Sequence, residues 1–147
     1  MARDTMTNAL YVIDASVAVK WFSQADEDDF EKALRLQELY LKRECALTAP
    51  DLIVYELVNA LRYNPNFDQK DTELALLSLQ KMGIELAASS ETLLKKAVEF
   101  AYQKNITIYD AAYAALALVQ RCLLVTADSK FYKKIQGFSQ VILLKDW

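Results

Sequence analysis

The chain has 147 residues, a length that suits one domain with a full hydrophobic core, and we expect residues 1–147 to form a single domain behind a loose N-terminal segment of about residues 1–9. Hydrophobic residues make up 54% of the chain and charged residues 25%, which is typical of a compact globular protein. The formal net charge is −3, and the chain contains no histidine and only two glycines, which excludes a histidine-based catalytic triad and the common glycine-rich phosphate-binding loops.

The apolar runs are far shorter than the roughly 20 residues of a membrane span, and the N-terminus lacks the long apolar stretch of a secretory signal. We therefore expect a cytoplasmic protein without membrane contact. Cys45 and Cys122 lie far apart and form no CxxC pair, so we expect two reduced core cysteines rather than a disulfide or a zinc site.

Hydrophobic periodicity and turn signals predict strands that alternate with helices. The first expected elements in chain order are a strand over Leu10–Asp14, a short helix over Val17–Phe22, an acidic turn over Gln24–Asp29, a helix over Glu27–Lys42 and a strand over Cys45–Thr48. Next we expect a helix that Thr48 and Pro50 start and that runs to about Arg62, a helix over Asp68–Lys81 that Gly83 ends, and a strand over Ile84–Ala88. The last part of the chain should form a helix capped by Ser89 or Ser90, a helix over Thr107–Val119, a strand over Cys122–Thr126, a short helix over Asp128–Ile135 and a strand over Val141–Leu144. In the helix over Asp68–Lys81 we expect Leu74, Leu77 and Met82 to point inward.

The expected strands are mostly continuous apolar runs, which is typical of strands buried on both faces. This pattern predicts an α/β fold with a mainly parallel sheet flanked by helices. Ligands of such sheets bind at the carboxyl ends of the strands, near the point where the strand order reverses. Asp14 and Asp128 each follow an expected strand, so the sequence predicts a site at this edge.

Four acidic residues lie in apolar surroundings. They are Asp14, Glu56, Asp110 and Asp128. Each has an ordinary alternative explanation, because the three aspartates can cap helices and Glu56 can be a solvated surface residue. Glu56 nevertheless has apolar residues at the positions that share its helix face, and the aspartates lie at expected element boundaries. Their joint placement therefore suggests one shared site.

Converging carboxylates need a cation. Two unit charges about 4 Å apart repel by about 4 kcal/mol at an effective dielectric of 20, so the sum over four carboxylates would rival a domain's stability of about 5–15 kcal/mol. Oxygen ligands favour Mg²⁺, with Mn²⁺ also suitable. A metal held in this way suits hydrolysis of a phosphodiester by metal-bound water, with the hydroxyls of Ser16 and Thr126 orienting a carboxylate or a water.

Four sequence blocks together resemble the PIN domain family, and within it the VapC-type toxins of toxin–antitoxin pairs. The blocks are Val-Ile-Asp14-Ala-Ser16, Tyr-Glu56-Leu-Val-Asn59-Ala-Leu, Tyr-Asp110-Ala-Ala-Tyr-Ala-Ala-Leu-Ala and Leu-Val-Thr126-Ala-Asp128-Ser-Lys-Phe. The resemblance extends from about Leu10 to Leu144 and implies a three-layer α/β/α sandwich. It implies Mg²⁺- or Mn²⁺-dependent endoribonuclease activity, with the four acids as metal-binding catalytic residues and Ser16 and Thr126 beside them. It also implies a homodimer and an antitoxin partner whose tail blocks the acidic groove.

An RNA substrate would need contacts outside the acids. The candidates are Lys20, Arg62, Lys130, Lys133 and Lys134, with Tyr109 available to stack a base. Two other readings lack a residue that they require, and a third remains open. A haloacid-dehalogenase-type phosphatase would need a second aspartate where Ser16 stands, and a response-regulator receiver would need an aspartate where the strand over Ile84–Ala88 ends. The third is a catalytically weak module that keeps the PIN fold and binds RNA or protein.

Overall fold

The computed structural model describes residues 8–23 and 29–147. The elements are β1 (Ala9–Ile13), α1 (Ala15–Lys20), α2 (Phe30–Leu41), β2 (Cys45–Pro50), α3 (Leu52–Arg62), α4 (Gln69–Met82), β3 (Glu85–Ala87), α5 (Glu91–Lys104), α6 (Ile108–Gln120), β4 (Leu123–Thr126), α7 (Ser129–Lys134), β5 (Val141–Leu143) and a 3₁₀ turn at Leu144–Asp146. Most of the predicted N-terminal segment and of the predicted acidic turn, and the predicted start of the helix at Glu27, lie outside the described residues.

The five strands form one sheet in the order β3-β2-β1-β4-β5, and every pair in it is parallel. This confirms the predicted parallel sheet. β1 lies at the centre, where Tyr11 pairs with Leu47 of β2 on one side and with Leu123 of β4 on the other. From β1 the chain first builds outward through β2 and β3, and then returns to add β4 and β5. The strand order thus reverses between β1 and β4, which makes their carboxyl ends the expected ligand-binding position.

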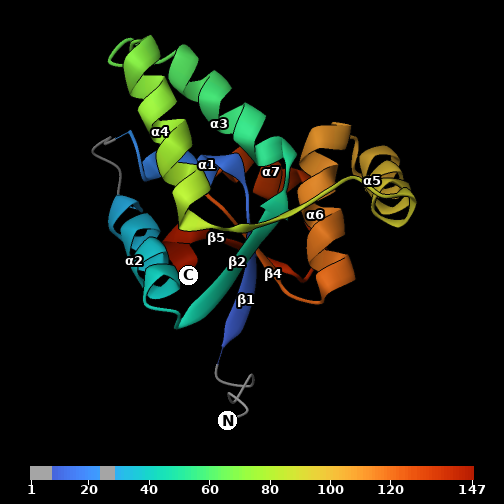
Figure 1. Ribbon diagram of the computed structural model, residues 1–147. Helices are drawn as coiled ribbons and strands as arrows, with labels where there is room; N and C mark the ends of the chain where they lie inside the picture. The colour runs from blue at the N-terminus through green and yellow to red at the C-terminus, as the bar shows by residue number, and fades with distance from the viewer. Residues whose placement is uncertain (1–7, 24–28) are drawn as a thin grey trace.

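Helices cover both faces of the sheet, as the α/β/α prediction requires. Figure 1 shows α5 and α6 together on one side of the sheet and α2 and α4 on the other. α6 is the most buried helix, because every residue from Ala111 to Ala117 is buried. Its alanines let it lie between the sheet and α5 at short range, and it contacts β1, β2 and β4 as well as α5.

Three predictions of local structure are wrong. Pro50 was expected in the first turn of a helix, but it is the last residue of β2, because Thr48–Pro50 pair with Glu85–Ala87 of β3. The strand over Ile84–Ala88 was expected to be buried, but β3 is the short edge of the sheet, and Glu85 and Leu86 are exposed. An edge strand packs on fewer neighbours, and so its sequence need not be apolar throughout.

The buried face of α4 also differs from the prediction. Leu74 and Leu77 are exposed, whereas Ala75 and Leu79 are buried. α4 packs against α3, and two buried residues four positions apart are sufficient for that narrow contact. Gly83 ends the helix as predicted, in the left-handed conformation that glycine adopts without strain. Cys45 and Cys122 are both unpaired, as expected. Across the two described stretches of chain, no helix has the length and apolarity needed to cross a bilayer.

Candidate active site

Asp14 is a buried carboxylate at the carboxyl end of β1, at the edge of the sheet where the site is expected. It follows β1, caps α1 and is only 7% exposed. Its Oδ1 accepts hydrogen bonds from the backbone N–H of Ser16, at 3.1 Å, and from the Ser16 hydroxyl, while its Oδ2 accepts from the Thr126 hydroxyl at 2.5 Å. These donors are all neutral. Burial therefore dominates, and it raises the pKa of Asp14 from 3.8 to about 6 although the hydrogen bonds oppose the shift.

The two hydroxyls around Asp14 also tie the ends of the central strands together. The Ser16 Oγ accepts from the backbone N–H of Ala127 at 2.9 Å, and the Thr126 Oγ1 accepts from the backbone N–H of Asp128 at 3.1 Å. Each hydroxyl thus donates to Asp14 and accepts from the segment after β4. The sequence placed Ser16 and Thr126 beside the acid, and the structure gives the contacts that hold it in one orientation.

Glu56 is held by a residue that sequence reasoning missed. The Tyr113 hydroxyl donates to Glu56 Oε1 at 2.5 Å, which joins α6 to α3. Tyr113 is 2% exposed, and both burial and its acidic partner raise its pKa, so it remains a neutral donor. Burial, followed by repulsion from Asp110, raises the pKa of Glu56 above its ordinary value although the hydrogen bond opposes this. The sequence feature that points to Tyr113 is its spacing, because it lies three residues after Asp110 and so on the same helix face.

Asp110 and Asp128 differ in what their side chains do locally. Asp128 caps α7, where its Oδ1 accepts from the backbone N–H groups of Lys130 and Phe131 at 3.0 and 3.1 Å. Asp110 caps nothing, because Thr107 is the N-cap of α6 and Asp110 is the third helical residue. Helix capping therefore accounts for one oxygen of Asp128 but not for Asp110, whose half-buried position at the acidic edge has no local structural explanation.

The four acids form one electrostatically connected group. Repulsion acts between Asp14 and Asp128, between Asp128 and Asp110, and between Asp110 and Glu56. Burial first, and then Asp128, raises the pKa of Asp110, and Lys134 opposes that shift. An all-carboxylate donor set, with Asp14 buried among neutral donors, suits a hard divalent cation. Within residues 8–23 and 29–147, however, no three acidic or cysteine side chains are already arranged as a set of metal ligands.

The predicted RNA-contacting residues occupy different environments. Lys20 is 12% exposed and pairs with Asp29 at 3.0 Å, so its charge is already compensated. Arg62 is exposed at the end of α3, with its guanidinium 5.5 Å from the centre of the Tyr63 ring. Tyr109 is 65% exposed. Lys130, Lys133 and Lys134 are exposed on α7, the helix that Asp128 caps.

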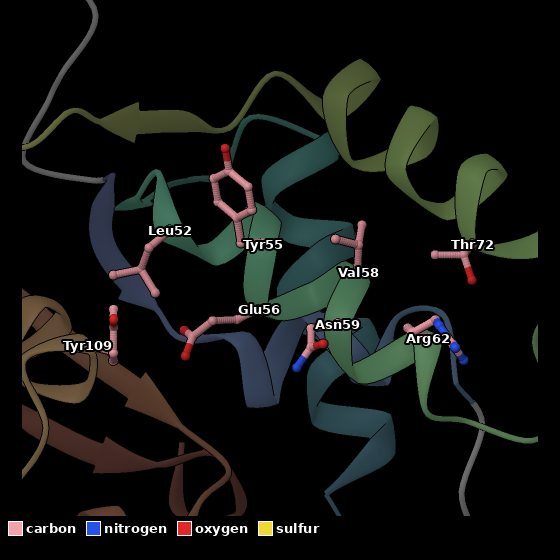
Figure 2. Close-up of a pocket in the computed structure, with 8 residues that line it drawn as sticks. All are labelled: Leu52, Tyr55, Glu56, Val58, Asn59, Arg62, Thr72 and Tyr109. Atoms are coloured by element: carbon pink, nitrogen blue, oxygen red, sulfur yellow. The ribbon is translucent and has the colours of Figure 1, made fainter. Parts of the chain in front are cut away.

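A pocket of about 750 Å³ extends from the acidic group along α3. Figure 2 shows Tyr109 beside Leu52 and Glu56 at one end and Arg62 with Thr72 at the other. The remaining lining residues are Tyr55, Val58 and Asn59. Tyr109 and Arg62 were predicted from the sequence as RNA contacts, whereas the pocket that includes both was not.

The sequence and the fold both match known proteins. The PIN domain family model matches residues 11–135. The chain is 25% identical over 127 residues, 86% of each sequence, to exonuclease VapC9 of Pyrobaculum aerophilum. The structure resembles VapBC2 of Rickettsia felis bound to a promoter DNA fragment (TM-score 0.66, 17% identity, 91% of this chain and 98% of that one). It also resembles VapC20 of Mycobacterium tuberculosis, a sarcin-ricin loop cleaving toxin (TM-score 0.65, 15% identity, 89% and 98%). The chain therefore belongs to the PIN domain family.

Proposed function

We propose that this protein is a metal-dependent endoribonuclease and the toxin of a type II toxin–antitoxin pair. The observation that carries the proposal is the buried Asp14 carboxylate, which two hydroxyls orient at the reversal point of a parallel sheet and which repels a second acid nearby. An acid buried without a cation is costly to a fold, and a ligand that compensates its charge explains the arrangement.

Each residue of the acidic site has a proposed role. Asp14, Glu56, Asp110 and Asp128 would hold Mg²⁺ or Mn²⁺, which supplies charge neutralisation at the phosphate and a water of lowered pKa. Ser16 and Thr126 fix the rotamer of Asp14, and Tyr113 fixes that of Glu56. Lys134, which already interacts electrostatically with Asp110, is placed to offset negative charge on the substrate backbone.

The comparisons support this proposal at the level of the family. The sequence relative is named an exonuclease, one structural relative is a sarcin-ricin loop cleaving toxin, and another is a VapBC complex. By the same reasoning we propose an antitoxin partner that covers the acidic edge, and a homodimer. Because this sequence relative is named an exonuclease, the first experiment must distinguish cleavage within an RNA strand from cleavage at its end.

The test uses a circular single-stranded RNA, which offers no end to an exonuclease. We expect the protein to open the circle with Mg²⁺ or Mn²⁺ and to leave it intact in excess chelator. Asp14→Asn should abolish opening while the circular dichroism spectrum stays unchanged. Asp51→Asn is the matched control, because Asp51 is an exposed acid that follows β2 and makes no side-chain cap hydrogen bond.

Three results would contradict the proposal. Cleavage that persists in chelator would exclude the metal mechanism. Cleavage of linear RNA alone would show an exonuclease. RNA binding without cleavage under any metal condition would favour the catalytically weak binding module.

A further inference from the structure

We propose that the pocket along α3 binds one unpaired nucleobase, with a preference for adenine, beside the phosphodiester that is cut. The inference rests on the proposed ribonuclease function. It adds a base-specific subsite made by Tyr109, Asn59 and Arg62, none of which belongs to the acidic group.

The position of the pocket ties it to the acidic group. Glu56 belongs to both, because its carboxylate accepts from Tyr113 and its side chain lines the pocket. A nucleic acid strand with a phosphate at the acids therefore has its neighbouring nucleotide at the mouth of this pocket. The pocket is open, and Tyr55 and Tyr109 are 79% and 65% exposed, so a base can enter without repacking of the core.

The Tyr109 end supplies a surface for stacking. Tyr109 on α6 lies beside Leu52 on α3, so an aromatic ring and an aliphatic side chain border the same space (Figure 2). Aromatic side chains hold single-stranded bases by stacking, and this contribution tolerates any base because every base has a π-face. A base of a duplex is already stacked and paired, and this subsite therefore selects an unpaired nucleotide.

Asn59 provides the polar edge that distinguishes one base from another. It is exposed on α3, one turn after Tyr55 and three residues after Glu56, and it lines the pocket. A carboxamide presents one donor group and one acceptor, which match the N7 acceptor and the N6 amino group of adenine. The charged lining residues nearest to Asn59 are Glu56 and Arg62, to which we assign the metal and a phosphate, so Asn59 is the amide that remains to recognise the base edge.

Arg62 completes the match to a nucleotide. It lies six residues after Glu56 on the same helix, a separation of about 9 Å along the axis, which is long enough for at least one nucleotide. Its guanidinium can hold the next phosphate. The pocket thus offers a ring for the base, an amide for its edge and a cation for its phosphate, a combination that fits a nucleotide group by group. An apolar peptide segment would use only the first of these features.

Binding to short oligoribonucleotides tests the subsite separately from cleavage. In the Asp14→Asn protein with Mg²⁺, fluorescence anisotropy would compare strands that carry adenine, purine without the 6-amino group, or an abasic residue at one position. We expect adenine to bind most tightly and the abasic strand most weakly. Tyr109→Ala should weaken binding of the adenine and purine strands about tenfold, whereas Asn59→Leu should remove only the adenine-over-purine difference, also about tenfold.

The controls make the outcomes separable. Tyr102→Ala removes a tyrosine that is 85% exposed on α5, outside the pocket, and should change nothing. Adenine-selective binding that depends on Tyr109 and Asn59 supports the subsite even if the wild-type protein cuts no RNA. Normal cleavage together with unchanged binding in both variants overturns the subsite and leaves the ribonuclease proposal intact. If Tyr109→Ala and Asn59→Leu bind the proposed antitoxin more weakly while their RNA affinity is unchanged, the subsite is also overturned and the pocket belongs to that partner.

Discussion

At the scale of single residues, Asp14 combines full hydrogen bonding with unfavourable burial of charge. Hydroxyl and backbone donors satisfy both of its oxygens, yet burial still raises its pKa to about 6. Neutral donors orient a carboxylate but compensate its charge only in part. The site is therefore organised at a cost to the stability of the metal-free protein, and this cost depends on pH.

The predicted pH dependence follows from the two states of Asp14. In the unfolded chain the carboxyl titrates near 3.8, and in the folded protein near 6, so between these values the folded state binds the extra proton. The free energy of unfolding of the metal-free protein should therefore fall as pH rises from about 4 to about 6, by about 3 kcal/mol from this group. Asp14→Asn lacks this titration. Urea unfolding in chelator should show the variant gaining about 3 kcal/mol relative to wild type between about pH 4 and pH 7.

The control for this measurement is again Asp51→Asn, which replaces an exposed acid and should not reproduce the gain expected for Asp14→Asn, because no buried charge is removed. The pH-dependent change is the informative quantity, since the amide introduced by Asp14→Asn can alter the absolute stability through its own hydrogen bonds. A difference between Asp14→Asn and wild type that does not vary with pH would show that Asp14 is not desolvated in the folded state.

At the scale of elements, the acidic edge depends on how α3 and α6 are positioned relative to each other. Small side chains let α6 lie directly on β1, β2 and β4, so that Asp110 in its first turn reaches the edge where β1 ends. Tyr113, one turn later, spans the distance to Glu56 on α3. The hydrogen bond between them connects two helices that are far apart in the sequence at the carboxyl edge of the sheet.

Tyr113→Phe tests this connection because it removes one hydroxyl and keeps the buried ring. Hydrogen bonds to charged groups contribute about 1.5–3 kcal/mol, and Glu56 is only half-buried and can be solvated instead, so we expect a loss of about 1 kcal/mol in urea unfolding at neutral pH. In Glu56→Gln the same Tyr113→Phe change should cost less, because the acceptor is then uncharged. Equal costs in both backgrounds would mean that the hydroxyl stabilises the Glu56 carboxylate no more than it stabilises a neutral amide.

The sequence predicted the elements whose patterns are local. β1 and β4 are buried apolar runs that end in an acid or precede one, so both the strands and the positions of Asp14 and Asp128 could be read directly. β3 and the end of β2 could not, because their extent depends on pairing with each other. The Tyr113 contact and the pocket depend on how α3 and α6 are rotated and packed, which no single helix encodes. The separation of the four carboxylates depends on side-chain rotamers and was likewise beyond the sequence.

At the scale of the whole molecule, the net charge of −3 hides an uneven distribution. The four acids are concentrated at one edge of the sheet and repel one another, while α7 ends in Lys133 and Lys134, of which Lys134 interacts electrostatically with Asp110. The repulsion stores free energy in the folded metal-free protein. A cation that binds there releases it and stabilises the folded state by mass action.

We expect Mg²⁺ or Mn²⁺ to raise the melting temperature of the wild-type protein. We expect Glu56→Gln to melt higher than wild type without metal and to gain less from metal. The introduced glutamine keeps an acceptor for Tyr113 and removes a carboxylate charge that burial, and then Asp110, disfavour. In chelator the variant should therefore melt higher than wild type, by about 2–4 °C if about 1 kcal/mol is relieved. With saturating metal it should gain less than wild type, because one ligand is lost. Glu85→Gln, which changes an exposed acid at the start of β3, should follow wild type in both buffers. A lower melting temperature for Glu56→Gln in chelator would mean that the surroundings of Glu56 stabilise its carboxylate. That result would contradict the proposal that the four acids need a cation to offset their charge.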